Sequence, residues 1–363
     1  MCLIKTWCCG SNVKTGRFEC RIYFLFLVKK METFEELGEF GFIDRIAQHK
    51  QGGDILCGIG DDCAVFALDA EWVRLVTTDM MVESIHFIRT VVPEGLGYKL
   101  LAVNLSDVAA MGGTPTDAVV SVSVPLDLHA GYLERVYNGL FACAEQFGVV
   151  IAGGDTTKSP EPLVLNVTLS GKMLRDRVCY RSGARPGDRV YVSGSLGDSG
   201  AGLALSGEEI SVSDVDRSFL FRRHHRPEPR VALGAALAKS GVVTAMMDVS
   251  DGVASDLRHI CKQSGVSGVI RKADVPLSTS YLAFCEATGR SELDLALGGG
   301  EDYELLFTVD PGQAEGLAQI VGQDGFPPVH WIGQIEGGQA ELFLEDECGR
   351  RAILTTKGFD HFR

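Results

Sequence analysis

The sequence predicts a two-domain protein of the α/β or α+β class. Its 363 residues are enough for two domains of ordinary size. Short apolar runs typical of strands recur along the chain with helical patterns between them, which favours layers of helices packed on sheets. Glycine is frequent, at 43 residues against 12 prolines, and this balance indicates tight backbone turns rather than a flexible linker.

The expected elements follow one another in mixed order. An acidic, helix-like segment is predicted first, at residues 34–49. Strands are predicted at apolar runs in residues 73–77, 118–124, 149–152, 163–169, 190–193, 304–309 and 329–335. Helices are predicted where apolar residues recur at helical spacing, in residues 98–111, 133–147, 229–239, 253–263 and 280–288.

A turn-rich basic segment divides the chain into halves of comparable length, YRSGARPGD at residues 180–188. We place the domain boundary near Met173, which gives an N-terminal domain at residues 31–173 and a C-terminal domain at residues 174–363. Residues 1–30 carry +5, from six basic residues against one acidic residue, and an acidic helical pattern starts at Met31. Residues 1–30 are therefore predicted to be a disordered or upstream-translated lead outside both domains.

Net charge and cysteine usage limit the partners. The whole chain carries −14, so the residues after the basic lead carry −19. Such an acidic surface argues against nonspecific binding to nucleic acid or to an anionic membrane. The apolar run at residues 22–28 is much shorter than the about 20 residues that a bilayer span needs. The 11 cysteines include no CxxC pair and no zinc spacing, which favours a reduced, cytoplasmic protein.

Six short segments place acidic residues beside Gly, Ser or Thr, next to an apolar run. They are GIGDD (58–62), TTD (77–79), NLSD (104–107), GGDTT (153–157), DVSDG (248–252) and GGGED (298–302). Each alone is more often an ordinary turn or a helix cap, and Asp251 could simply cap the helix predicted from residue 253. Together they predict one pocket lined by carboxylates, provided that the segments converge.

Asp107 is the acid for which a plain turn or cap is the weakest explanation. On a helix it falls in one stripe with Leu100, Asn104 and Met111, so the carboxylate lies among apolar neighbours. No Lys or Arg lies three or four residues away, and an unpaired buried charge is costly. Its partner must come from elsewhere in the fold, as a structural ion pair or through a metal or phosphate-linked role.

Converging carboxylates predict a divalent cation. Two like charges about 4 Å apart repel by about 4 kcal/mol at an effective dielectric constant of about 20. Mg²⁺ takes oxygen ligands and usually lies between carboxylates and substrate phosphates, so a magnesium nucleotide is the expected ligand. Calcium is the competing ion, but the sequence has no EF-hand loop. It also has no P-loop and no kinase-type HRD segment, so a kinase would belong to neither common type.

A further glycine-rich stretch, GSLGDSGAG at residues 194–202, follows a predicted strand and precedes a helical pattern. It is compatible with a turn that cradles phosphate. However, G-x-x-G spacing is common by chance, and the Rossmann G-x-G-x-x-G pattern is not matched. A plain tight connection is the alternative interpretation.

Eight motifs occur in the chain in an order and spacing that resemble the thiamine-monophosphate kinase family. They are GIGDDCA (58–64), TTD (77–79) followed by HF (86–87), NLSDVAAMG (104–112), GGDTT (153–157), RSGA (181–184), DVSDG (248–252), GGGEDYEL (298–305) and KGFDHF (357–362). The resemblance extends from about Gly38 to Phe362 and leaves out the lead. This family shares a superfamily with aminoimidazole ribonucleotide synthetase, selenophosphate synthetase and a hydrogenase-maturation protein.

The resemblance implies a fold and a reaction. The N-terminal α/β domain would contribute a four-stranded sheet that pairs with that of a second subunit in a barrel, and a C-terminal α/β domain would follow. The active sites would lie in a cleft between the domains, near the interface of a homodimer. The reaction would convert ATP and thiamine monophosphate into ADP and thiamine diphosphate. ATP and several Mg²⁺ ions are the expected cofactors, with a monovalent cation as a further candidate.

The resemblance also assigns roles to the matching positions. It implies a magnesium-binding set of Asp62, Thr77, Thr78, Asp79, Asp107, Asp155, Asp248 and Asp251. It implies nucleotide contacts from Tyr137, Gly154, Arg181 and Ser250, and contacts to the thiamine phosphate from His86, Glu301 and Phe359. The residues expected to carry catalysis are Asp107, Asp155, Arg181 and Asp248.

The residues taken alone leave plainer roles open for three of these positions. His86 could be an ordinary surface or core histidine, Phe359 could pack the C-terminus, and Tyr137 could belong to the core. No general base is expected, because a phosphate monoester with a second pKa of about 6 is largely dianionic at about pH 7. Catalysis would then rest on positioning and charge neutralisation, with Arg181 as a fixed cation.

Two alternative functions stay open on the sequence. One is another ATP-dependent synthetase of the superfamily. The reactive cysteines of selenophosphate synthetase and of the hydrogenase-maturation protein are not matched, whereas aminoimidazole ribonucleotide synthetase is opposed only by the motif at residues 357–362. The other alternative is a non-catalytic protein that binds a magnesium nucleotide in the same acidic pocket.

Overall fold

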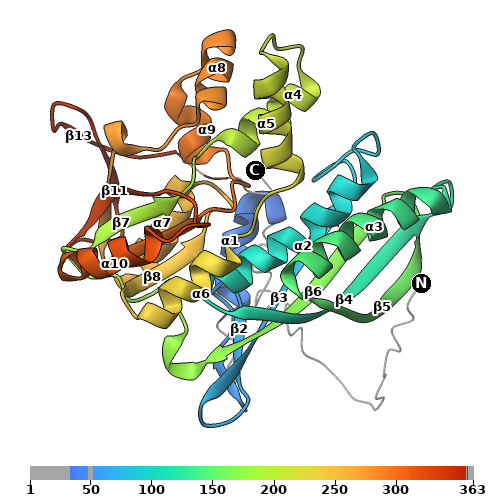
Figure 1. The fold of residues 1–363 in the computed structure, drawn as a ribbon, viewed down its shortest axis with the longest axis horizontal. Helices are drawn as coiled ribbons and strands as arrows, with labels where there is room; N and C mark the ends of the chain where they lie inside the picture. Colours follow the sequence, from blue (N-terminus) through green and yellow to red (C-terminus); the bar gives the residue numbers. More distant parts are fainter. Residues whose placement is uncertain (1–32, 48–51, 357, 359–363) are drawn as a thin grey trace, which may run out of the picture.

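The computed structural model describes residues 33–47, 52–356 and 358, which form two sheets with helices packed on them (Figure 1). The expected lead at residues 1–30 lies outside the described residues. The first helix, α1 (Phe34–Ile46), begins with a capping box. In this box the side chain of Thr33 accepts a hydrogen bond from the backbone N–H of Glu36, and the Glu36 side chain accepts one from that of Thr33.

The first sheet has six strands in the order β1-β2-β3-β6-β4-β5. They are β1 (Ile55–Cys57), β2 (Ala64–Ala67), β3 (Trp72–Val82), β4 (Thr114–Pro125), β5 (Val150–Ser159) and β6 (Val164–Leu174). The long strands β3, β6 and β4 pair antiparallel, whereas β5 runs parallel to β4. Every second side chain of β6 is buried, as expected for a sheet with one face against a core and the other face open.

Helices α2 (Pro93–Ala110) and α3 (Ala130–Phe147) lie along the covered face of this sheet (Figure 1). Two glycines allow their backbones to touch. A Cβ on Gly97 would lie 1.7 Å from a backbone oxygen of α3, and a Cβ on Gly139 would lie 1.8 Å from a backbone oxygen of α2. Almost every residue of α2 is buried, so this helix is an internal layer of the molecule.

The second sheet has seven strands in the order β13-β12-β9-β11-β7-β10-β8. They are β7 (Arg189–Ser193), β8 (Val243–Asp248), β9 (Ser267–Arg271), β10 (Leu305–Val309), β11 (Val329–Glu336), β12 (Leu342–Glu345) and β13 (Arg351–Ile353). The pair β12 and β9 is parallel and the other pairs are antiparallel. Asp248 is the last residue of β8, an edge strand of this sheet.

Seven helices accompany the second sheet in the described residues. They are α4 (Asp198–Gly207), α5 (Asp214–His225), α6 (Val231–Ser240), α7 (Val253–Ser264), α8 (Thr279–Thr288), α9 (Glu292–Gly298) and α10 (Ala314–Val321). Short 3-10 turns occur at Arg175–Arg177, Lys272–Asp274 and Pro311–Gln313. Helices α4, α5, α8 and α9 gather at the top of the view in Figure 1, beyond the end of α2.

Helix α2 joins the two halves of the molecule. A Cβ on Gly234 of α6 would lie 2.1 Å from the backbone oxygen of Ala109 in α2, so only glycine permits this approach. The core around α2 also includes Met246 of β8 and Phe307 of β10. Side chains from the two sheets are therefore held in fixed relative positions.

Strand β6 ends at Leu174 and β7 begins at Arg189, and the domain boundary near Met173 stays a prediction. None of the helices in the described part of the chain has both the length and the apolar character needed to cross a membrane.

Candidate active site

Strand β3 directs two of its three consecutive polar side chains toward α2, because side chains alternate along a strand. Thr77 is buried, and its Oγ1 donates a hydrogen bond to Asp107 Oδ2. Thr78 is exposed on the opposite face, where its Oγ1 donates to the backbone oxygen of Val167 at 3.1 Å. Asp79 is again on the side of Thr77. The segment TTD thus brings two side chains, not three, to the face that α2 covers.

Three carboxylates from distant parts of the chain meet beside Thr77. Asp62 follows β1, Asp107 lies in the last turn of α2, and Asp248 ends β8. Each offers an oxygen, and these oxygens all lie within 4.8 Å of one another. Ser106 Oγ donates to Asp248 Oδ2 at 2.5 Å and so ties α2 to β8. Both halves of the molecule therefore contribute to one carboxylate cluster, which we define as Asp62, Asp107 and Asp248.

These carboxylates are hard to ionise together. Burial and then the nearby carboxylates raise the pKa of Asp107 well above its ordinary value. Burial likewise raises the pKa of Asp248 to about 8 and that of Asp79 to about 6. At the 4.8 Å limit, each ionised pair would repel by about 3.5 kcal/mol at an effective dielectric constant of about 20. The summed repulsion of the three pairs would be as large as the free energy of unfolding of a whole domain, which is about 5–15 kcal/mol.

Several oxygens of this site accept no hydrogen bond from the residues that the structure describes. They are Asp62 Oδ2, Asp79 Oδ2 and Asp248 Oδ1, all of which are buried. Buried polar atoms normally have a partner, and a buried carboxylate oxygen without one is unfavourable. Mg²⁺ is a hard cation that takes carboxylate oxygens. The residues present therefore fit Mg²⁺.

Arg181 supplies a fixed cation beside the carboxylate cluster. Its Nε lies 3.1 Å from Asp62 Oδ1, its Nη2 contacts the same oxygen, and its backbone N–H donates to Asp61 Oδ2 at 3.3 Å. Burial lowers the pKa of Arg181, but Asp62 and Asp61 raise it more, so the guanidinium stays charged. Burial raises the pKa of Asp61 to about 7. One guanidinium offsets only part of the negative charge gathered here.

The loop between α9 and β10 brings Glu301 to a second part of the site. Glu301 Oε1 lies 2.8 Å from Lys99 Nζ of α2, and Oε2 lies 3.4 Å from His224 Nδ1. Burial would raise the pKa of Glu301, but Lys99 and His224 lower it overall, so the group is an anion. Glu301 and Tyr303 have φ values of 56° and 51°, a conformation that residues with side chains rarely adopt. Backbone strain of this kind is typical of functional loops.

His86 lies near Glu301 and has a defined tautomer. The backbone N–H of Val82 donates to His86 Nδ1 at 3.0 Å, so the neutral ring carries its proton on Nε2. A positive charge on His86 would lower the pKa of Glu301, so the two side chains lie within electrostatic range of each other. The structure therefore brings together two of the residues predicted to contact the thiamine phosphate.

Asp155 lies apart from the carboxylate cluster. It is in the interior of β5, opposite Ser121 of β4. The same row across the sheet continues through Asn166 of β6 to Met80 of β3. This row belongs to the open face of the sheet, and Asp155 is three strand spacings from β3, about 14 Å. Asp155 and Asp107 therefore cannot bind the same ion within one chain.

Gly154 and Tyr137 also lie away from the carboxylate cluster. Gly154 packs against β4, where a Cβ would lie 1.8 Å from the backbone oxygen of Val120. The ring of Tyr137 is half-buried on α3, 5.9 Å from that of Phe141. Their roles as nucleotide contacts stay predictions.

Ser250 and Asp251 follow Asp248 in the loop after β8. The backbone oxygen of Ser250 accepts a hydrogen bond from the N–H of Glu301 at 2.7 Å, which connects the two parts of the site. Asp251 is half-buried. The expected nucleotide and metal roles of these two residues stay predictions, and Phe359 lies outside the described residues.

Sequence reasoning missed Asp256 of α7. This residue is 1% exposed, and neither of its carboxylate oxygens accepts a hydrogen bond within the described ranges. Burial and then Asp251 and Asp248 raise its pKa well above the ordinary value. The available signal was its helical stripe, because Val253 and Ile260 lie three residues before it and four residues after it.

The glycine-rich turn at residues 194–202 already has an internal anion. The backbone N–H groups of Gly197 and Ser199 donate to the carboxylate of Asp302 at 2.7 and 3.1 Å. These donors begin α4, where a phosphate would otherwise bind. The structure thus favours the tight connection over the phosphate-cradling turn.

Known families and proteins resemble the chain over most of its length. Residues 60–173 match the family described as AIR synthase related protein, N-terminal domain, and residues 185–344 match its C-terminal domain. The chain is 40% identical over 328 residues to the thiamine-monophosphate kinase of Aquifex aeolicus, covering 90% of this chain and 99% of that protein. It is 38% identical over 329 residues to the thiamine-monophosphate kinase of Escherichia coli K12, covering 90% of this chain and 98% of that protein.

Solved structures show the same fold. The structure of AaThiL complexed with AMPPCP and TMP aligns with a TM-score of 0.80 at 36% identity, covering 91% of this chain and 99% of that chain. The thiamine-monophosphate kinase of Stenotrophomonas maltophilia K279a aligns with a TM-score of 0.69 at 36% identity, covering 87% and 98%. The expected two-domain fold is confirmed, whereas the barrel between subunits stays a prediction. The chain belongs to the thiamine-monophosphate kinase family.

Proposed function

We propose that this chain transfers the terminal phosphoryl group of ATP to thiamine monophosphate and releases ADP and thiamine diphosphate. The observation that carries this proposal is the carboxylate cluster of Asp62, Asp107 and Asp248, with its buried oxygens that lack hydrogen-bond partners in the described residues. The names of the relatives support the reaction, and so does AaThiL, which was solved with AMPPCP and TMP.

Magnesium would be held by Asp62, Asp79, Asp107 and Asp248. When bound, Mg²⁺ supplies positive charge that neutralises the phosphate groups during transfer. The chain fixes the ligands beforehand: Thr77 and Ser106 donate to Asp107 and Asp248, and Arg181 binds Asp62. Arg181 would also place a guanidinium beside the phosphates, where it needs no reorganisation during the reaction.

The acceptor would need no general base, because its phosphate is already largely dianionic at about pH 7. The organic part of thiamine monophosphate contains a thiazolium ring with a permanent positive charge, which carries the phosphorylated side chain. Glu301 is an anion whose pKa is lower than usual, and His86 presents Nε2–H as a donor near it. These two residues would bind and orient the acceptor, and stacking of Phe359 on its ring stays a prediction.

A second copy of the chain would cover the open face of the six-stranded sheet. Met80 and Val119 lie on this face and are 56% and 43% exposed, which is a large exposure for apolar side chains on central strands. Thr78 and Asp155 lie on the same face. We expect a homodimer in which Asp155 acts in the site of the other copy, since it cannot reach the carboxylate cluster of its own chain.

The chain would work in a reducing compartment. The seven cysteines among the described residues are all free, and free cysteines are typical of reducing surroundings. We propose the cytoplasm.

A coupled ADP-release assay tests the reaction, with thiamine monophosphate and unphosphorylated thiamine as alternative acceptors. We expect turnover with thiamine monophosphate alone and thiamine diphosphate as the product. Asp107→Asn is expected to lower kcat by several orders of magnitude, whereas Asp324→Asn, a change at an exposed acid, should leave it unchanged. ATP binding without turnover would contradict the proposal and favour a non-catalytic nucleotide-binding protein, and equal turnover with thiamine would contradict the acceptor.

A further inference from the structure

A cavity of about 710 Å³ lies between α2 and the group of helices that contains α5. Four arginines line it, Arg222, Arg223, Arg226 and Arg230, against two glutamates, Glu228 and Glu304. Its wall therefore carries a net charge of +2, although the whole chain carries −14. It shares no lining residue with the carboxylate cluster. We call it the arginine cavity.

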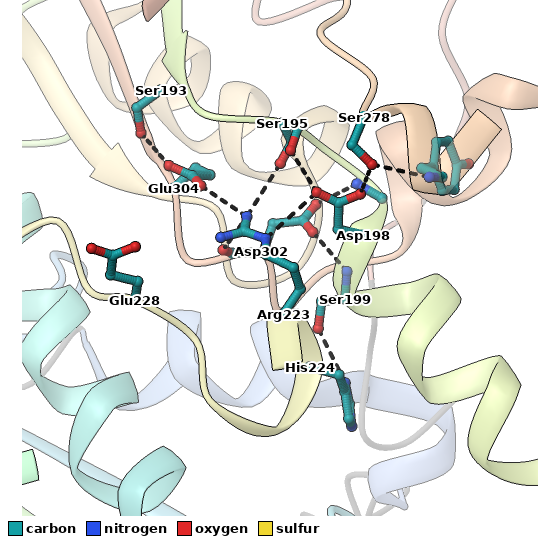
Figure 2. Close-up of polar contacts among 12 residues, drawn as sticks. Ser193, Ser195, Asp198, Ser199, Arg223, His224, Glu228, Ser278, Asp302 and Glu304 are labelled. Atoms are coloured by element: carbon teal, nitrogen blue, oxygen red, sulfur yellow. Dashed lines mark hydrogen bonds and ion pairs between the residues drawn. The ribbon is translucent and has the colours of Figure 1, made fainter. Parts of the chain in front are cut away.

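Two of these arginines are used by the fold. Arg230 Nη2 and Nε lie 2.6 and 2.7 Å from the two oxygens of Glu304. Arg223 Nη2 lies 2.8 Å from Glu304 Oε1 (Figure 2). Ser193 Oγ also donates to Glu304 at 2.5 Å. The Glu304 side chain is fully buried, and only 11% and 10% of the Arg223 and Arg230 side chains are exposed. This network builds the floor of the cavity.

The other two arginines have no acidic partner among the described residues. The guanidinium of Arg226 lies 4.4 Å from the ring centre of Tyr98, and that of Arg222 lies 5.6 Å from the ring centre of Phe219. Both side chains are exposed at the rim of the cavity. Stacking on an aromatic ring holds a guanidinium in place and leaves its N–H groups free to donate to an anion.

The wall beside these arginines is apolar. It is lined by Pro276, Leu277, Pro327 and Pro328. Phe219, whose ring lies under Arg222, also lines the cavity. Ligand sites of about 300–1,000 Å³ typically combine such apolar walls with a few polar groups that fix the orientation. The partial negative charge at the C-terminus of α5 attracts basic residues and explains why they occur in the last turn of this helix. This attraction falls off within one turn. It covers Arg226 as well, which caps this helix, but it does not explain the apolar wall.

We propose that the arginine cavity binds an organic phosphate, with its phosphate groups on Arg222 and Arg226 and its ring against the proline wall. This site is separate from the proposed kinase site and needs no metal, because its own side chains supply the positive charge. Nucleotides and thiamine phosphates both have the required chemistry, an aromatic ring joined to a phosphate chain.

The test uses the difference in metal requirement. The carboxylate cluster repels phosphate without Mg²⁺, whereas the arginine cavity does not. Binding of ADP, thiamine diphosphate and inorganic diphosphate to the full chain would be measured by calorimetry in excess EDTA. We expect one of the organic phosphates to bind once per chain and more tightly than inorganic diphosphate. Tighter binding of ADP would identify a nucleotide site, and tighter binding of thiamine diphosphate a thiamine phosphate site.

Arg222→Gln combined with Arg226→Gln is expected to weaken this binding at least tenfold, and each single substitution should weaken it less. The matched control, Arg175→Gln with Lys239→Gln, removes the same charge from two exposed positions elsewhere and should leave binding unchanged. Three results would overturn the proposal: no metal-independent binding up to millimolar ligand, equal weakening by the control, or inorganic diphosphate binding as tightly as both organic phosphates. None of them bears on the kinase reaction, which is measured with Mg²⁺.

Discussion

Replacing Asp248 by asparagine is expected to stabilise the metal-free protein while weakening its response to Mg²⁺. Asp248 is 1% exposed, receives one hydrogen bond from Ser106, and has its Oδ1 without a donor in the described residues. Asp62 and Asp107 lie within 4.8 Å. Asparagine keeps the shape and the acceptor for Ser106 but removes the charge. The variant therefore isolates the cost of holding an ionised carboxylate in this place.

The magnitude follows from the pKa of Asp248, which burial and then Asp62 raise from 3.8 to about 8. Between these values the native state holds a proton that the unfolded chain has lost, so the free energy of unfolding falls as pH rises. At pH 7 the difference from 3.8 is about 3 pKa units, which at about 1.36 kcal/mol per unit gives an upper limit of about 4 kcal/mol. Asp62 and Asp107 share this effect, so the gain from one substitution is smaller.

Urea unfolding in EDTA, from about pH 5 to pH 8, measures the effect. Wild type should lose stability across this range, and Asp248→Asn should lose less and be the more stable protein at pH 8. Mg²⁺ should stabilise wild type strongly and Asp248→Asn weakly. Asp324→Asn, at an exposed acid, should follow wild type throughout. A wild-type protein whose metal-free stability rises with pH, or an Asp248→Asn variant less stable than wild type at pH 8, would refute this reasoning.

Three further predictions concern other parts of the molecule. Arg181→Ala should lower kcat about 100-fold or more, because it removes a preorganised positive charge from the phosphates; a change confined to the KM for ATP would contradict this role. His86→Ala should raise the KM for thiamine monophosphate while kcat changes little, and steady-state kinetics showing the reverse would remove His86 from acceptor binding. Glu304→Gln should destabilise the protein by about 3–5 kcal/mol in urea unfolding, because Arg223 and Arg230 would stay buried without their shared anion. Unfolding at the same urea concentration as wild type would show that these arginines find other partners.

Much of the first sheet could be predicted from periodicity. The strand predicted at residues 163–169 lies within β6, and the helix predicted at 98–111 lies almost wholly in α2. Elements with no long apolar run were missed, including α5, whose twelve residues are mostly charged or polar, and the short strands β12 and β13. Their positions depend on packing against distant parts of the chain, which local pattern does not report.

The part of the site around Asp107 could be predicted from the sequence, because this residue lies in a helix with a clear apolar stripe. The stripe through Leu100, Asn104 and Asp107 placed this acid among apolar neighbours, and its partner proved to be Thr77 from a distant strand. The position of Asp155 was harder to predict, because Gly153 and Gly154 before it indicated a turn. In the structure β5 continues through them, and the second glycine permits close contact with β4. Side chains alternate between the two faces of a strand. Applied to residues 77–79, this rule would have placed Thr78 on the face opposite Thr77 and Asp79.

The central claim is that Asp62, Asp107 and Asp248 form one metal site that serves phosphate transfer. Its most direct test is Mn²⁺ binding, followed by electron paramagnetic resonance, in wild type and in Asp107→Asn with AMPPCP present. We predict that wild type binds Mn²⁺ tightly and that Asp107→Asn weakens this binding at least tenfold. Equal Mn²⁺ affinity in the two proteins would contradict the claim.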